Sequence, residues 1–235
     1  MLPRFVLVLC AASTVGCQAF ATSEAPDSPA GPVCSREVVI EDGENHDNQV
    51  IQHMGRNGYM YTFSDDVGTT VTPTAGKRGG TFSMAEGGSN GSAYAARFEG
   101  TIARGDLVYA GFGINFVDPK GPYDASAHSG VSFYARRSEG SAAKLRLKVP
   151  DGNTAPEAKR CSECFNDFGT DLALTERWQE FVIPFDKMQQ LPGWGTPRPA
   201  TVDARSIYGL QWQIDQQGAP YDVWIDDVSF VGCAP

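Results

Sequence analysis

Two adjacent carboxylates interrupt the last stretch of the chain that favours a β-strand. Asp226 and Asp227 lie in the run 221–230, and most of its residues favour a pleated, half-buried surface. Asp is depleted from such strands, so the pair needs a local reason. One reason is a hard cation, because Ca²⁺ prefers carboxylate and carbonyl oxygens. The alternative is that Asp227 occupies a bulge and accepts hydrogen bonds from backbone amides.

A second set of residues has the chemistry of sugar recognition. Flat aromatic faces pack on the apolar side of a pyranose, and planar polar groups bind its hydroxyls. Such side chains fall on the polar faces of several expected strands, and three further aromatic residues could frame a groove. The set consists of Tyr109, Asn115, Tyr134, Arg136, Arg146, Gln211 and Gln213, framed by Tyr59, Tyr61 and Trp194. Because a solvated sheet face has the same composition, these residues are a pool of candidates.

No recognisable catalytic motif accompanies these residues. Glycosidases need two carboxylates at a controlled separation, and none of the 28 acidic residues lies in a hydrolase signature. The histidines His46, His53 and His128 have neither metal-ligand spacing nor a Gly-x-Ser-x-Gly partner. We therefore expect a protein that is not an enzyme.

Alternating runs must position the candidate side chains. Every second residue is apolar in several short runs, separated by turn clusters: residues 108–116, 131–135, 145–149, 181–185 and 208–214. Helix-period stripes are nearly absent, and a turn near residues 185–190 is the only helix candidate. Each run has one apolar and one polar face, as two packed antiparallel sheets require. The sequence therefore predicts an all-β fold, a two-sheet antiparallel β-sandwich, with Trp212 on the core side.

The start of the chain has the form of a secretory signal. Arg4 precedes the apolar run 5–12, which is too short to span a bilayer. Residues 14–17 resemble a lipobox with an atypical Thr14, whereas residues 19–21 offer an Ala-x-Ala cleavage site. We favour a signal peptide over residues 1–17 and lipidation at Cys17, because the following residues suit a tether. The product would be exported, as a membrane-anchored lipoprotein or as an extracellular protein.

Residues 18–33 and 34–235 differ in composition. The first segment is rich in Ala, Ser, Thr and Pro and has few large apolar groups, which predicts a flexible linker. The second is long enough for one sandwich domain. Loss of the leader removes Arg4 and leaves 18 basic against 28 acidic residues, a net charge of −10. Such a surface repels nucleic acid, so we expect no nucleic-acid partner.

Several blocks, in order along the chain, resemble the family 11-like carbohydrate-binding modules, which are galactose-binding-like jelly rolls of bacterial cell-surface proteins. Residues 55–65 are similar to the Gly-x-x-Gly-x-Trp-x-x-Tyr-x-Asp entry of that family, with Met60 where Trp is typical. The terminal run is similar to its last strand, aromatic-x-x-Trp-Ile-Asp-Asp-Val-x-Phe. Further blocks lie at residues 39–44, 123–126, 130–135, 168–169, 178–179, 193–195 and 210–213.

The resemblance implies a jelly roll that binds a polysaccharide without cleaving it, the ligand being β-glucan-like or another structural polysaccharide, and a monomer. Related sandwiches also serve as surface or assembly proteins without a sugar site, which is the alternative function. Jelly-roll modules often carry a structural calcium where the first and last strands meet. The ligand set implied here is Glu41, Asp42, Glu44, Asp226 and Asp227.

Four cysteines remain after the leader, and an even number in an exported chain indicates disulfides. Cys34 precedes the first expected strand and Cys233 follows the last, so a bridge between them requires neighbouring termini, as in jelly rolls. Cys161 and Cys164 would then form a local ring. A zinc site lacks a second ligand pair nearby, and a thioredoxin-like motif lacks its helix.

Overall fold

The computed structural model describes residues 37–74 and 84–232. The predicted signal peptide, the linker, the lipidated Cys17 and the Cys34–Cys233 bridge lie outside these residues. Within them, no helix has the length and hydrophobicity that a membrane span requires. The predicted Cys161–Cys164 disulfide is present.

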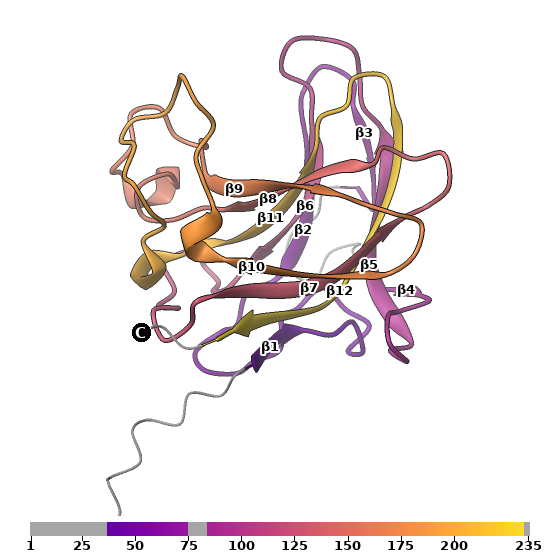
Figure 1. The fold of residues 1–235 in the computed structure, drawn as a ribbon, viewed down its shortest axis with the longest axis horizontal. Helices are drawn as coiled ribbons and strands as arrows, with labels where there is room; N and C mark the ends of the chain where they lie inside the picture. Colours follow the sequence, from indigo (N-terminus) through magenta and orange to yellow (C-terminus); the bar gives the residue numbers. More distant parts are fainter. Residues whose placement is uncertain (1–36, 75–83, 233–235) are drawn as a thin grey trace, which may run out of the picture. The chain divides into compact units, whose positions relative to one another are not determined.

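The strands of the described residues form two antiparallel sheets (Figure 1). The seven-stranded sheet has the order β10-β7-β12-β5-β3, with β1 beside β12 and β4 beside β5. Its strands are β1 (Glu37–Glu41), β3 (Thr70–Thr72), β4 (Ala85–Glu86), β5 (Tyr94–Thr101), β7 (Gly130–Arg137), β10 (Gln179–Pro184) and β12 (Pro220–Val231). The predicted all-β sandwich is confirmed.

The five-stranded sheet has the order β2-β6-β11-β8-β9. Its strands are β2 (Met60–Ser64), β6 (Ala110–Asn115), β8 (Lys144–Val149), β9 (Phe168–Ala173) and β11 (Gly209–Ile214). The expected helical turn near residues 185–190 is a single 3-10 turn, Phe185–Lys187. Two similar turns, Pro156–Ala158 and Ala204–Ser206, lie in other loops of the described chain.

Aromatic side chains fill the space between the sheets. Trp212 of β11 is fully buried and packs on Phe112 of β6 and Phe133 of β7, with ring centroids 5.4 and 5.2 Å apart. Such pairs contribute about 0.5–1.5 kcal/mol beyond the area they bury. Because Phe133 belongs to the seven-stranded sheet, this cluster joins the two layers. The predicted core position of Trp212 is confirmed.

A β-bulge in β12 explains the paired carboxylates of the last strand. Asp226 pairs with Tyr134 of β7 and Ser229 pairs with Ser132, so two residues of β12 stand opposite Phe133. Asp227 has a left-handed φ of 49°, and Asp tolerates that conformation better than most residues. The extra residue shifts the alternation of side chains along β12 by one position. Ile225 before the bulge and Phe230 after it therefore both face the core.

Trp224 is buried on the outer side of β12, away from the core. Its register partners on the neighbouring strands are Arg97 and Arg136. Their guanidinium carbons lie 4.9 and 4.2 Å from its ring centroid, and Arg136 also lies 5.2 Å from the ring of Trp178. Burial, together with the neighbouring Arg97 charge, lowers the pKa of Arg136. Arginine side chains therefore cover this aromatic surface.

Candidate functional site

The outer face of the five-stranded sheet forms the floor of a cleft of about 1060 Å³. The chemistry of the floor changes from strand to strand. Strand β2 contributes aromatic rings, β6 contributes Asn115, β11 contributes Gln211 and Gln213, and β8 contributes basic side chains. Because side chains alternate along each strand, these residues point away from the buried Trp212.

A row of four aromatic rings runs along one side of this floor. The centroid of Tyr61 lies 6.1 Å from that of Tyr59 and 6.1 Å from that of Phe63. Phe63 in turn lies 6.2 Å from Tyr109, which precedes β6. Tyr59, Tyr61 and Phe63 are two residues apart in the chain, so their common side follows from the strand alternation.

The two glycines of β6 leave room for these rings. A Cβ atom on Gly111 would lie 2.3 Å from Cζ of Phe63, and one on Gly113 would lie 2.5 Å from Cζ of Tyr61. Both separations are far below van der Waals contact, so the rings occupy space that other residues would fill. The glycines therefore let the rings lie over the backbone of β6 and form a platform.

Polar groups continue the floor beyond the platform. Gln211 donates from Nε2 to the hydroxyl of Tyr61 at 3.0 Å, and burial raises the pKa of that hydroxyl, which keeps it neutral. Lys148 pairs with Asp167 at 3.0 Å and donates to Gln213 at 3.4 Å. The neutral amides and the compensated charges offer both donors and acceptors to a ligand.

The structure gathers eight of the ten predicted sugar-binding residues in this cleft: Tyr59, Tyr61, Tyr109, Asn115, Arg146, Trp194, Gln211 and Gln213. Tyr134 and Arg136 lie elsewhere, on β7 of the seven-stranded sheet. Arg146 is held by Asp171 at 3.0 Å and by the carbonyl oxygen of Gln189 at 2.8 Å. Polar alternation identified outward-facing residues but could not assign them to one of two sheets.

Several lining residues were absent from the predicted set: Phe63, Leu107, Lys148, Phe165, Asp167 and Leu191. Phe63 and Lys148 continue the alternation of Tyr61 and Arg146, so the pattern contained a signal for them. Phe165, Leu191 and Leu107 lie in loops. No periodicity marks such positions, because only the folded chain brings them to the sheet.

The residues predicted to bind calcium lie around the end of β1 and the bulge of β12. Asp226 accepts hydrogen bonds from the amides of Ser89 at 2.6 Å and Asp227 at 2.8 Å, and Asp227 accepts one from the Ser89 hydroxyl at 2.9 Å. Glu44 accepts from the amides of residues 93 and 94, and Asp42 accepts from the amide of Glu44. Across residues 37–74 and 84–232 no three His, Cys, Asp or Glu side chains are grouped to hold a metal.

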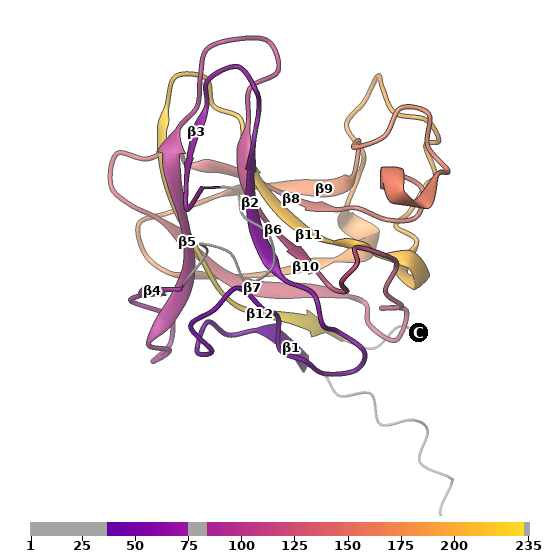
Figure 2. The ribbon, with the colours of Figure 1, turned by 180° about the vertical axis from the view of Figure 1, so that it is seen from behind.

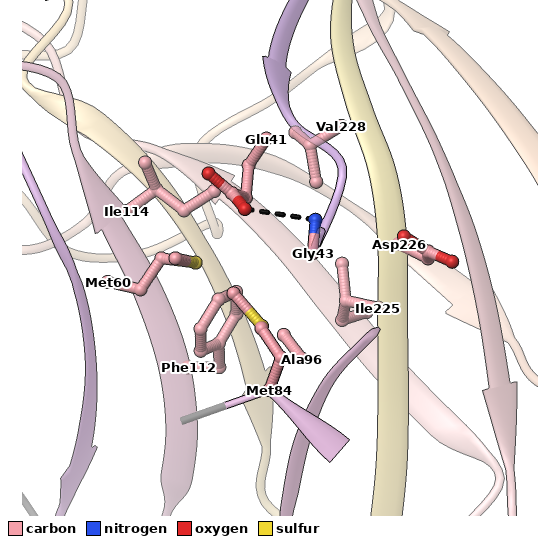
Figure 3. Close-up of a pocket in the computed structure, with 10 residues that line it drawn as sticks. All are labelled: Glu41, Gly43, Met60, Met84, Ala96, Phe112, Ile114, Ile225, Asp226 and Val228. Atoms are coloured by element: carbon pink, nitrogen blue, oxygen red, sulfur yellow. Dashed lines mark hydrogen bonds between the residues drawn. The ribbon is translucent and has the colours of Figure 1, made fainter. Parts of the chain in front are cut away.

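Glu41 differs from the other four acids because its side chain enters the sandwich. A register shift in β1 places it beside a small cavity of about 10 Å³, lined by Met60, Met84 and Phe112 among others. Figure 3 shows its carboxylate on the core side of β12 and that of Asp226 pointing away from it. One oxygen accepts from the Gly43 amide at 2.9 Å, and the other has no protein partner. Burial raises the pKa of Glu41 to about 8.

No protein-family model and no curated protein matches the chain. Among solved structures, a family 11 carbohydrate-binding module from Clostridium thermocellum, in complex with a β-1,3-1,4-mixed-linked tetrasaccharide, is 15% identical with a TM-score of 0.55, covering 84% of this chain and 96% of that chain. The solution structure of CtCBM11 gives a TM-score of 0.57 at 14% identity, covering 86% and 99%. A family 30 module gives 0.54 at 15% identity, covering 83% and 99%. The expected resemblance to family 11 modules is confirmed for the fold.

Replacement of Glu41 by Gln should stabilise the protein at alkaline pH, measured in the presence of a chelator. The pKa of Glu41 in the folded protein is about 8, above the ordinary value of 4.5. As pH rises, Glu41 therefore loses its proton at a lower pH in the unfolded chain than in the folded one. The free energy of unfolding of the wild type should therefore fall as pH rises from about 4.5 to about 8, by an amount on the order of a few kcal/mol. Glu41→Gln removes this dependence, and thermal melting from pH 4 to pH 9 measures it.

The exposed Glu86 of β4 provides the matched control. Glu86→Gln should melt with the pH profile of the wild type. If the melting temperatures of Glu41→Gln and the wild type differ by the same amount at every pH, then the fold does not hold Glu41 in its protonated form.

Proposed function

We propose that the cleft binds one chain of a neutral structural polysaccharide, a β-glucan in the first place, and does not cleave it. The observation that carries the proposal is the aromatic platform of Tyr59, Tyr61, Phe63 and Tyr109 beside the amides of Gln211 and Gln213. Rings that follow one another along a strand offer repeated packing surfaces to a ligand that itself repeats. The amides supply donors and acceptors for its hydroxyls.

The charges of the cleft favour an uncharged ligand. Three basic residues line it, Lys120, Arg146 and Lys148, and so do three acidic ones, Asp106, Asp167 and Asp215. The whole chain carries a net charge of −9. An acidic polysaccharide would meet no excess of positive charge in the cleft and a repulsive field outside it.

Two buried acceptors also suit a ligand rich in hydroxyl groups. Oδ1 of Asn115 and Oδ1 of Asp167 are buried and have no protein hydrogen-bond partner, and both residues line the cleft. An unsatisfied buried acceptor costs about 1–3 kcal/mol. Hydroxyl groups of a bound sugar, or water before it binds, would donate to these oxygens.

Binding without cleavage agrees with the state of the carboxylates in the cleft. Asp167 is paired with Lys148, whereas Asp106 and Asp215 are exposed to solvent. The solved family 11 neighbour is described in complex with a mixed-linked tetrasaccharide as a binding module. We extend its ligand class, a β-1,3-1,4-mixed-linked saccharide, to this chain because the cleft lies on a sheet of the same fold.

The proposed location is the bacterial cell surface. It rests on the leader, on the Gly16-Cys17 pair and on the linker composition of residues 18–33. A lipid on Cys17 would hold the binding domain near the membrane. Calcium at the β1–β12 edge stays part of the proposal, supported by the adjacent carboxylates of Asp226 and Asp227 at the bulge of β12.

Binding to a panel of soluble glucan, xylan, mannan and chitin fragments tests the function. Tyr61→Ala should weaken binding of the preferred polysaccharide about tenfold or more, because it removes a packing surface worth about 1.5 kcal/mol. Tyr61→Phe retains the ring and should bind within a fewfold of the wild type. Arg136→Ala, on the other sheet, should leave binding unchanged while lowering stability, since it uncovers Trp224. Calorimetric titration measures the affinity of each variant, and melting curves measure its stability.

Two results would contradict the proposal. Should the wild type bind no member of the panel at millimolar sugar, the alternative of a surface or assembly protein replaces it. Release of reducing sugar by the pure protein, abolished by replacement of one cleft carboxylate, would make the protein an enzyme.

The lipid anchor predicts that Cys17→Ser releases the protein from the membrane fraction. Lipid attachment requires the thiol of Cys17, and the alternative cleavage after Ala21 does not. Fractionation with mass spectrometry of the mature N-terminus checks this. An unchanged distribution with a mature N-terminus at Thr22 would show free secretion.

Calcium binding predicts a higher melting temperature in calcium than in chelator, because an ion held only by the folded state stabilises it by mass action. Asp226→Asn should remove the difference. Identical melting curves, together with no metal in elemental analysis, would remove the site.

A further inference from the structure

Two loops form one wall of the cleft. Residues 150–167 connect β8 to β9, residues 185–208 connect β10 to β11, and the two views show them side by side at one end of the five-stranded sheet (Figures 1 and 2). Phe165 of the first loop and Leu191 and Trp194 of the second line the cleft. These large apolar side chains are between 41 and 60% exposed. The wall therefore presents apolar surface to the cleft instead of burying it.

The buried side chain of Asn166 fastens the two loops to each other. Its Nδ2 donates to the carbonyl oxygens of Leu191 at 2.9 Å and Trp194 at 2.6 Å, and its Oδ1 accepts from the amide of Leu191 at 2.9 Å. Gly195 has a φ of 91°, and a Cβ there would lie 2.8 Å from Cβ of Asn166. Only glycine allows the second loop to approach so closely.

The Cys161–Cys164 disulfide closes a short ring directly before Phe165. This ring is attached to the second loop just beyond Trp194. Ser162 donates its amide to the carbonyl oxygen of Thr196 at 3.0 Å, and Thr196 donates its amide to that of Glu163 at 3.2 Å. The hydroxyl of Thr196 also donates to the Glu163 carboxylate at 2.7 Å. The disulfide ring is thus hydrogen-bonded into the same wall.

Phe165 has a conformation that packing does not explain. Its φ of 71° lies in the left-handed region, which a bulky residue rarely adopts. Its amide donates to the carbonyl oxygen of Thr154 at 3.0 Å, which holds the backbone in place. Yet its side chain is 60% exposed. Strained residues that the surrounding structure holds in place cluster at binding sites.

We infer that Phe165 contacts the bound saccharide and that the Cys161–Cys164 disulfide is the device that positions it. The inference rests on the proposed function of the cleft. The Phe165 ring adds a second aromatic surface, carried by a loop, to the platform carried by β2. The disulfide restricts the conformations of the residues before Phe165, so that the ring is in place before the ligand arrives.

One consequence is that binding depends on the oxidised form. A dithiol reductant would supply two electrons and two protons, leave thiols on Cys161 and Cys164, and itself become a disulfide. Phe165 would then be free to leave its strained conformation. Binding would be strongest in an oxidising compartment, where exported proteins keep their disulfides.

A double-mutant cycle with soluble β-1,3-1,4-mixed-linked glucan tests the inference. Phe165→Ala should weaken binding about five- to tenfold, the equivalent of one aromatic packing surface. The pair Cys161→Ser and Cys164→Ser should also weaken binding, by no more than that factor. The triple variant should bind no more weakly than Phe165→Ala, because the disulfide affects binding only through the position of the Phe165 side chain. Val182→Ala, at a similarly exposed apolar position on β10, is the matched control and should bind as the wild type does.

Serine variants are preferable to reduction because a reductant would also open the predicted Cys34–Cys233 bridge. The inference is overturned if Phe165→Ala, or a folded serine pair, binds with wild-type affinity. It is also overturned if the loss of affinity in the triple variant is the product of the two separate losses. If the serine pair fails to melt cooperatively, Phe165→Ala and Phe165→Trp decide the matter, with loss and retention of affinity expected. A wild type that binds no polysaccharide of the panel refutes the proposed function itself, which is a different outcome.

Discussion

The register of β12 is the constraint on which the sandwich depends. This strand pairs with β1, β5 and β7, and its inward residues must face the other sheet from Tyr221 to Phe230. Two acidic residues in the middle would break that pattern in a regular strand. The bulge absorbs one of them, Asp227, in a left-handed conformation, and the loop at Ser89 supplies hydrogen-bond donors to both carboxylates. A local irregularity thus preserves the global alternation.

Aromatic residues on the two outer faces of the sandwich differ in whether other side chains cover them. On the seven-stranded sheet, Arg97 and Arg136 cover Trp224, whose ring is buried as a result. On the five-stranded sheet, glycines replace covering side chains, and Tyr61 and Phe63 lie on bare backbone beside an open cleft. Covered rings add stability, whereas uncovered rings in a cleft are available to a ligand. This difference distinguishes the cleft from an ordinary solvated sheet face.

Local alternation predicts the strands well, because each strand must separate an apolar from a polar side. The core residues Phe112, Leu147 and Trp212 follow from it directly. The sheet to which a strand belongs does not follow from alternation, since strand pairing joins residues far apart in the chain. Arg136 and Gln211 therefore have the same pattern in sequence and lie on different sheets. The exposed Phe165 has no sequence signal at all, because a hydrogen bond to Thr154 and the contacts of neighbouring residues with the second loop fix its place.

The platform and the wall gain their rigidity from different sources, and this bears on what each can contribute to binding. Backbone pairing of β2 with β6 fixes the strand that carries Tyr61 and Phe63 of the platform. The wall depends on a few groups, chiefly Asn166, Gly195 and one disulfide. Ordering both before the ligand arrives lowers the conformational entropy lost on binding. Changes in the wall can therefore alter ligand preference while the platform and the core stay intact, as expected when function lies in loops on a rigid scaffold.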